Sequence, residues 1–271
     1  MKNAKEIFFK FIFISFSVTL LFGCMSSTSA GLVGADRSQL FLYSESQMNQ
    51  SAASQYSQVI AEAKSAKTLN TNAATYRRVQ NIADKLIAQT KTFRSDALDW
   101  DWEVNVITDS TINAWCMPGG KIVVYTGIID SLDLTDGELA AVMGHEISHA
   151  LKEHSREQAS RAALTQLGIA TIASVTNMGD LGTTALALGA QYGLTLPFSR
   201  DNESEADEMG TELMARAGYN PNDAVNVWRK MNSLSQGEVP EFMSTHPSNS
   251  SRISNLQKVA AKVYPLYEEA K

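Results

Sequence analysis

The feature that most constrains the fold of this chain is a pair of histidines, His145 and His149, separated by one helical turn. They lie in a run of helix-forming residues, so both imidazoles project from one helix face and can bind the same metal ion. Glu146 follows the first histidine and can act as a general base on a water beside that ion. A surface helix with two unrelated histidines is the alternative, but the chain has only 4 histidines, so a chance match is improbable. The pattern therefore predicts a zinc site on this helix.

A zinc ion bound by two histidines needs a third protein ligand and an open position for water. Downstream, Glu203 and Asp207 are four residues apart in a second helix-forming run and share one face. If Glu203 binds zinc, Asp207 can accept a hydrogen bond from a ligating imidazole and fix its tautomer. Spacing alone favours a solvated acidic face, and only the histidine pair makes a metal ligand the better interpretation. Glu205 points to another face and is expected to take no part in zinc binding.

The third histidine, His154, is not predicted to be a ligand. Five residues turn a helix by about 500°, which places His154 on a different face from His149. It lies near the C-terminal end of the same predicted helix, where a histidine interacts favourably with the helix dipole. We therefore expect a structural role for His154.

Together these motifs resemble the M48 zinc metallopeptidases. The resemblance rests on His145-Glu146-x-x-His149 followed by Glu203-x-x-Ala206-Asp207. Asn113–Lys121 is similar to the family's strand and turn before the catalytic helix, and Ser244–Ser248, followed by Arg252, is similar to its His-Pro segment. The resemblance covers roughly residues 73–262 and is closest to the LoiP-type periplasmic lipoprotein proteases.

The resemblance implies an α+β, predominantly α-helical, gluzincin-like fold with a small β-sheet before the helix that carries the histidine pair. It implies a zinc-dependent endopeptidase with one Zn²⁺ per chain, held by His145, His149 and Glu203, with Glu146 as the catalytic base. His246 is the candidate for stabilising the oxyanion, or for a fourth zinc ligand that substrate displaces, and a surface loop histidine is the alternative. Arg252 is expected to support the site.

By the same resemblance, the expected substrates are misfolded or misassembled envelope proteins, and other envelope proteases or assembly machinery are possible partners. One alternative is an envelope chaperone or assembly factor with a little-used zinc site, which the complete motif disfavours. Another is a maturation protease for one dedicated partner. The net charge of -6 and the lack of a basic block argue against nucleic-acid binding.

The first 24 residues resemble a bacterial lipoprotein signal. Three lysines precede an uncharged apolar run, residues 11–22, which has the length of a signal-peptide core and is too short to span a bilayer. The run ends at Gly23-Cys24, where the resemblance implies cleavage and acylation of Cys24. Met25 follows in place of Asp, which favours the periplasmic leaflet of the outer membrane. An ordinary signal peptide with an incidental cysteine and a membrane-spanning anchor are the alternatives.

The mature chain is predicted to have two parts. Residues 24–66 comprise the lipidated N-terminus, a Ser/Gly-rich tether to about Ser44 and one helix, and residues 67–271 comprise the peptidase domain. In that domain we expect a helix over 73–90, strands over 102–107, 112–117 and 121–126, and helices after residue 136. The strand over 102–107 is a candidate edge for adding extended substrate by β-pairing.

Two further features leave alternatives open. The uncharged stretches 162–178 and 181–199 contain scattered polar residues, which favours buried or lid-forming helices over membrane segments. Once Cys24 is acylated, Cys116 has no partner in the chain. Because apolar and aromatic residues flank it, a buried thiol is favoured over an intermolecular disulfide.

Overall fold

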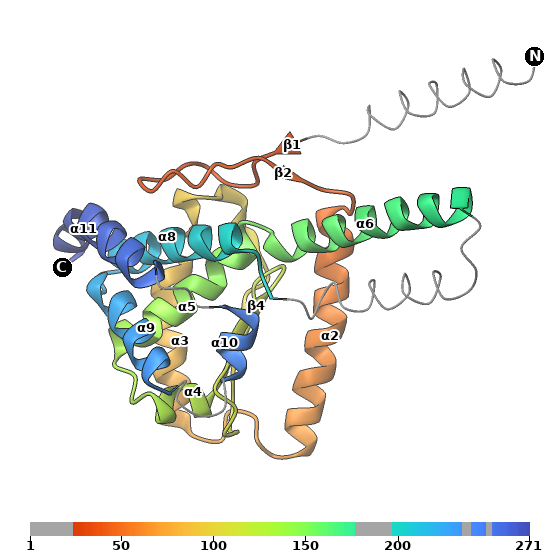
Figure 1. The fold of residues 1–271 in the computed structure, drawn as a ribbon. Coiled ribbons are helices and arrows are strands. Elements are labelled where there is room, and N and C mark those ends of the chain that lie inside the picture. Colours follow the sequence, from red (N-terminus) through yellow and green to blue (C-terminus); the bar gives the residue numbers. More distant parts are fainter. Residues whose placement is uncertain (1–23, 177–196, 235–239, 248–250) are drawn as a thin grey trace, which may run out of the picture.

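The computed structural model describes residues 24–176, 197–234, 240–247 and 251–271 (Figure 1). The signal-peptide prediction for residues 1–23 and most of the uncharged stretch 181–199 lie outside the described residues. The described part is mostly helical, with a small sheet of three strands before the helix that carries the histidine pair. The predicted fold class is therefore confirmed.

The sheet consists of β3 (Glu103–Ile107), β4 (Ala114–Met117) and β5 (Lys121–Tyr125), in the order β3-β5-β4. The central strand, β5, is parallel to β3 and antiparallel to β4. The turn between β4 and β5 uses Gly119 and Gly120, whose φ angles of 79° and 85° suit residues without a Cβ. The two strands therefore form a hairpin.

Helices cover the sheet on two sides because β5 is apolar on both faces. Val123 packs with Tyr56 and Ile60 of α2 (Glu45–Ser65) on one side. Ile122 and Val124 belong to the main core on the other side, which includes α3 (Ala73–Ile87) and α5 (Asp136–Leu151). The predicted helices and strands are thus present, with ends that differ by a few residues.

The two motif helices, α5 and α8 (Arg200–Arg216), form the most extensive helix pair of the described structure. Thr135 and Glu138 form a capping box that begins α5, and the Ser199 side chain accepts the Asn202 amide to begin α8. The helices approach closely because glycines meet at the crossing: a Cβ on Gly144 would lie 2.9 Å from the carbonyl oxygen of Gly210. This close approach brings the two motifs together.

The expectation of a tether over residues 26–44 is wrong, because this segment packs on the peptidase domain. Cys24–Met25 (β1) pairs with Gln39–Leu40 (β2), and the loop between them lies along the domain. Glu212 accepts the Leu32 amide at 2.8 Å and the Val33 amide at 3.0 Å. The fully buried Lys152 donates to the carbonyl oxygens of Ala35 (3.0 Å) and Arg37 (2.9 Å). Buried donors and acceptors need such partners, so these bonds hold the segment in place.

The remaining elements enclose this centre. They are η1 (Thr90–Thr92), η2 (Ser95–Asp99), α4 (Thr126–Ser131), α6 (His154–Thr176), α9 (Asn222–Leu234), α10 (Glu241–Thr245) and α11 (Arg252–Ala270). Helix α6 includes most of the uncharged stretch 162–178 and extends away from the body of the molecule (Figure 1). Among the described residues, no helix combines the length and apolar character needed to cross a membrane.

Candidate metal centre

Four buried side chains from three elements converge on one point: His145 and His149 of α5, Glu203 of α8, and His246 directly after α10. The Nε2 atoms of His145 and His149 are 3.0 Å apart. Glu203 places Oε1 3.3 Å from His149 Nε2 and Oε2 3.5 Å from His145 Nε2. The structure therefore brings together the three predicted zinc ligands, and it adds the predicted loop histidine to them.

Asp207 and Arg252 hold the first histidine in position. His145 Nδ1 lies 3.0 Å from Asp207 Oδ1, and Arg252 binds that carboxylate at 2.6 and 2.8 Å. Arg252 also donates to Glu203 Oε2 at 2.7 Å and stacks on Trp228, 3.4 Å from the ring centroid. Burial raises the pKa of Asp207, but Arg252 and His145 outweigh it and lower the pKa overall. Asp207 and Arg252 thus lie where the sequence analysis expected supporting residues.

The second histidine is fixed by two residues that the sequence analysis did not assign to it. Phe198 stacks on the His149 ring at a centroid distance of 4.1 Å. His154 Nδ1 lies 2.8 Å from His149 Nδ1, and His154 Nε2 lies 3.0 Å from Glu205 Oε2. As expected, Glu205 is not one of the four clustered residues, but it contacts the cluster through His154.

The hydrogen positions in this cluster follow from its partners. His145 Nδ1 faces a carboxylate, so it carries the ring hydrogen and Nε2 is left as a lone pair. If His149 donates its Nδ1 hydrogen to His154, its Nε2 is also a lone pair. Two lone pairs 3.0 Å apart repel each other unless a cation lies between them. Ligand atoms bound at about 2.1 Å to a tetrahedral ion lie about 3.4 Å from one another. The nitrogen and oxygen atoms of His145, His149 and Glu203 have similar separations, 3.0 to 3.5 Å. The residues present therefore fit a divalent metal ion.

Glu146 lies beside this cluster but is not one of its four possible metal ligands. Its Oε1 is buried and has no hydrogen-bond partner among the described residues, and the nearest ring nitrogen, His246 Nε2, is 3.3 Å away. Burial raises the pKa of Glu146 to about 7. A buried carboxylate oxygen without a partner is costly in a folded protein, and it is common where the group handles protons.

His246 is positioned by the short helix before it. The Phe242 amide donates to the Ile112 carbonyl oxygen at 3.1 Å, which fixes α10 beside β4, and the Phe242 ring stacks on His246. His246 Nδ1 then lies 2.9 Å from Glu203 Oε1 and 3.2 Å from His145 Nε2. His246 is only 3% exposed, which excludes the alternative of a surface loop histidine.

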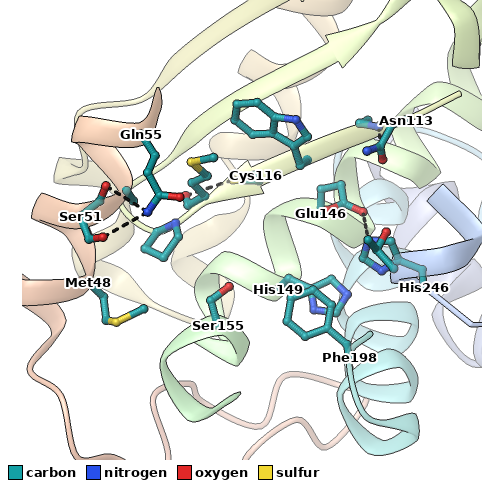
Figure 2. Close-up of a pocket in the computed structure, with 16 residues that line it drawn as sticks. Met48, Ser51, Gln55, Asn113, Cys116, Glu146, His149, Ser155, Phe198 and His246 are labelled. Carbon is teal, nitrogen blue, oxygen red and sulfur yellow. Dashed lines mark hydrogen bonds and ion pairs between the residues drawn. The ribbon is translucent and has the colours of Figure 1, made fainter. Parts of the chain in front are cut away.

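A cleft of about 230 Å³ opens beside the cluster (Figure 2). Its floor includes Glu146, His149 and His246, one wall is the segment 113–118 with β4, and Met48, Ser51 and Gln55 of α2 lie opposite. β4 pairs only with β5 in the described sheet, so its other edge carries no strand there. The strand over 102–107 was predicted as the substrate edge, but that strand, β3, does not line the cleft. Its outer side is also contacted by the segment around Leu69 and Asn70.

Cys116 lines the same cleft but does not join the donor cluster. The thiol is buried and free, and burial raises its pKa well above its usual value. A thiol kept in its neutral form is a poor metal ligand and a poor nucleophile. This agrees with the favoured expectation of a buried thiol.

Comparison with known proteins was consistent with the motifs. The model of peptidase family M48 matches residues 73–260. The chain is 39% identical over 163 residues to the mitochondrial metalloendopeptidase OMA1 of Schizosaccharomyces pombe, covering 59% of this chain and 47% of that one. It is 29% identical over 198 residues to the β-barrel assembly-enhancing protease of Yersinia pestis (69% and 39% covered). Against metalloprotease YcaL of Escherichia coli it is 26% identical over 268 residues (95% and 97% covered).

The aligned region covers only part of this chain and only part of the mitochondrial relatives. It spans 47% of the Schizosaccharomyces pombe protein and 33% of its Arabidopsis thaliana counterpart, so the chain matches between a third and a half of the length of these relatives. The LoiP-type subgroup stays a prediction, since none of these relatives identifies it. The family match nevertheless covers the histidine pair, Glu203, Asp207, His246 and Arg252 in one domain. On this match and the geometry of the four-residue cluster, the chain belongs to peptidase family M48.

Proposed function

We propose that this protein is a zinc-dependent endopeptidase of the bacterial cell envelope that hydrolyses peptide bonds in unfolded or misassembled proteins. The observation that carries the proposal is the pair of facing Nε2 atoms of His145 and His149, with the Glu203 carboxylate beside them. This set of two imidazoles and one carboxylate is the one that peptidases use for catalytic zinc. Zinc bound there would polarise the scissile carbonyl and make water acidic near neutral pH.

The chain's own residues supply the proton transfers. Glu146 Oε1 faces the cleft without a hydrogen bond, so it can accept a proton from the attacking water. Its pKa of about 7 suits both taking that proton and returning it to the leaving amine. Asp207 and Arg252 keep the His145 ring oriented throughout, because their contacts lie on the side away from the cleft.

His246 is better suited to the donor set than to oxyanion stabilisation. Its Nδ1 faces Glu203 and His145, and its Nε2 faces Glu146. In this arrangement the ring stands between the general base and the donors, where the attacking water has to enter. We infer that His246 is the fourth ligand of a resting site and that it moves aside when substrate binds.

Extended, unfolded segments are the substrates that the cleft favours. Among the described residues no strand pairs with the outer edge of β4 along the cleft wall, and backbone pairing to such an edge depends little on sequence. Side chains of α2 line one end of the cleft, and Glu146 lies at the other (Figure 2). A substrate backbone paired to β4 would run along the cleft towards Glu146.

The envelope location rests on the N-terminal pattern and on the relatives. A lipid on Cys24 would anchor the protein by burying acyl chains, each CH₂ contributing about 0.8 kcal/mol. One relative is named for enhancing β-barrel assembly. Replacing Cys24 with Ser should remove labelling by a palmitate analogue and shift the protein from the membrane fraction to the soluble fraction. Unchanged labelling and fractionation would contradict lipidation.

The central experiment is Glu146→Gln with zinc content and casein cleavage measured on the same preparation. We expect one zinc per chain in both proteins and a cleavage rate at least about 100-fold lower in the variant. Glu62→Gln is the matched control, since Glu62 is exposed on α2 and should change neither quantity. A variant that keeps zinc and cleaves at the wild-type rate would exclude Glu146 as the base. Equal envelope phenotypes with and without Glu146 would favour a chaperone.

A further inference from the structure

The two histidines of the metal centre are supported in different ways. The Nδ1 of His145 meets a carboxylate directly, since Asp207 accepts its hydrogen and Arg252 neutralises Asp207. The Nδ1 of His149 meets a second imidazole, His154, at 2.8 Å. Here the carboxylate that corresponds to Asp207 is Glu205, which contacts His154 Nε2 at 3.0 Å and does not contact His149 directly. The arginine that corresponds to Arg252 is Arg37.

A break in the helix makes this second chain of contacts possible. On a continuous helix His154 would face away from His149. Instead α5 ends at Leu151, Glu153 adopts a φ of 54°, and α6 begins at His154. This left-handed residue turns the chain so that the fully buried His154 ring returns to the His149 ring.

The order of contacts determines where each hydrogen lies. Glu205 is acceptor-only when ionised, so His154 must carry its hydrogen on Nε2. His154 Nδ1 is then an acceptor, and His149 has to donate to it from Nδ1. That leaves the Nε2 of His149 free to bind the metal. If His154 carried its hydrogen on Nδ1 instead, the proton of His149 would be forced onto Nε2, where it blocks metal binding.

Arg37 keeps Glu205 ionised and in place. Its Nε and Nη2 donate to the two oxygens of Glu205, each at 2.8 Å. Its Nη1 and Nη2 also bind Glu157, again at 2.8 Å, so one guanidinium binds both carboxylates and offsets the repulsion between them. Without Arg37, the two carboxylates would repel each other next to a buried ring, and Glu205 would turn towards solvent.

Arg37 belongs to the N-terminal segment 26–44, which precedes the residues 73–260 matched by the family model. Lys152 fixes this segment by donating to the Arg37 carbonyl oxygen, and the neighbouring Gln39 donates to Glu157 at 2.9 Å. Arg37 is therefore held in place by the packed N-terminal segment. If this segment were a flexible tether, Arg37 would not have a fixed position.

We propose that Arg37, Glu205 and His154 are positioning residues that set the tautomer of His149, so that the N-terminal segment is part of the metal centre. This inference rests on the proposed metal site. Loss of such outer contacts typically weakens metal binding by about 10–100-fold. We expect that range for Glu205→Gln and for Arg37→Gln, and a smaller loss for Arg37→Lys, which keeps the charge but not the two-pronged contact.

The test is zinc affinity by chelator competition on the full chain, together with ¹⁵N NMR of the histidine tautomers in the metal-free protein. Arg161→Ala is the matched control, because Arg161 pairs with Glu157 but does not contact Glu205. It should leave both readouts unchanged, whereas Glu205→Gln should add a population of His149 protonated on Nε2. Combining Glu205→Gln with His154→Phe should weaken zinc binding no more than His154→Phe alone, since both act through one chain of contacts.

The outcomes separate this inference from the proposed function. A wild-type chain that binds no zinc would refute the metal site itself. Wild-type affinity and tautomers in Arg37→Gln and Glu205→Gln would overturn only the positioning role. If Glu205→Gln lowers the melting temperature of the metal-free protein, Arg37→Lys carries the test, because it keeps a positive charge beside Glu157 and Glu205 and removes only the two-pronged contact.

Discussion

Gly210→Ala tests whether close packing of two helices builds the metal centre. Gly210 lies one helical turn after Asp207 and two turns after Glu203, so it shares their face of α8. A Cβ at this position would lie 2.7 Å from the His145 amide nitrogen and 2.8 Å from the Gly144 carbonyl carbon. Non-bonded heavy atoms prefer about 3.5 Å, so α8 has to move away from α5 by about 0.8 Å. Metal–ligand distances tolerate only about 0.2 Å.

We therefore expect Gly210→Ala to weaken zinc binding by at least about 10-fold, the lower end of what disturbed ligand support produces. Overpacking should also lower the free energy of unfolding by about 1–3 kcal/mol. Helix propensity acts in the opposite direction and favours alanine by up to about 1 kcal/mol. The measurements are chelator competition for zinc and urea unfolding of the metal-free protein.

Gly137→Ala is the control, because it adds the same methyl group to the first turn of α5, far from the crossing. Its Cβ would meet the side chain of Asp223, whose carboxylate can rotate aside. We expect wild-type zinc affinity there. If Gly210→Ala binds zinc as tightly as the control and unfolds at the same urea concentration, the helix contact does not position Glu203, and the reasoning fails.

Three further predictions follow from the site and its support. His246→Ala should weaken zinc binding by about 10-fold without lowering kcat on casein, if His246 is a displaceable ligand; a fall in kcat at unchanged affinity would assign it to the oxyanion instead. Burial raises the pKa of Glu157, but bonds from Arg37 and Gln39 lower it to about 2 from 4.5. Because the folded pKa is the lower one, this group's stabilisation is complete above about pH 4.5 and is lost between there and pH 2. We expect about 2 kcal/mol over that range after allowing for solvent screening, and Glu157→Gln should flatten the acid limb of the unfolding curve. Lys152→Met removes a donor from two carbonyl oxygens and leaves that of Arg37 without one among the described residues, since Ala35 still accepts from the Thr28 hydroxyl; it should therefore cost about 1–3 kcal/mol and speed hydrogen exchange in residues 26–44; protection equal to wild type would contradict it.

Most of the fold could be predicted from local patterns. The alternation in β3 and the two glycines after β4 each act within a few residues, and the structure has the strand and the turn that they predict. Strand order could not be predicted, because β5 is paired on both sides by strands whose contacts are non-local. The edge that faces the cleft was therefore assigned to the wrong strand.

The N-terminal segment shows a different limit. Ser and Gly residues are typical of a flexible tether, and a local pattern contains no information about distant partners. Glu212 lies about 180 residues further along the chain from the amides that it accepts. Such bonds form only after the domain has folded, so composition alone misidentified the segment.

The side chains of the metal centre could be identified from local patterns. His145 and His149 share a helix face through periodicity alone, and Glu203 and Asp207 do so on a second helix. The residues that support them became apparent only from the folded structure. His154 was placed on the wrong face by assuming a continuous helix, and Glu205 was set aside for pointing away from Glu203. One left-handed residue, Glu153, reverses the chain between α5 and α6 and joins His149, His154, Glu205 and Arg37. Helical periodicity governs residues within one helix, whereas contacts across a helix break depend on packing that no local pattern encodes.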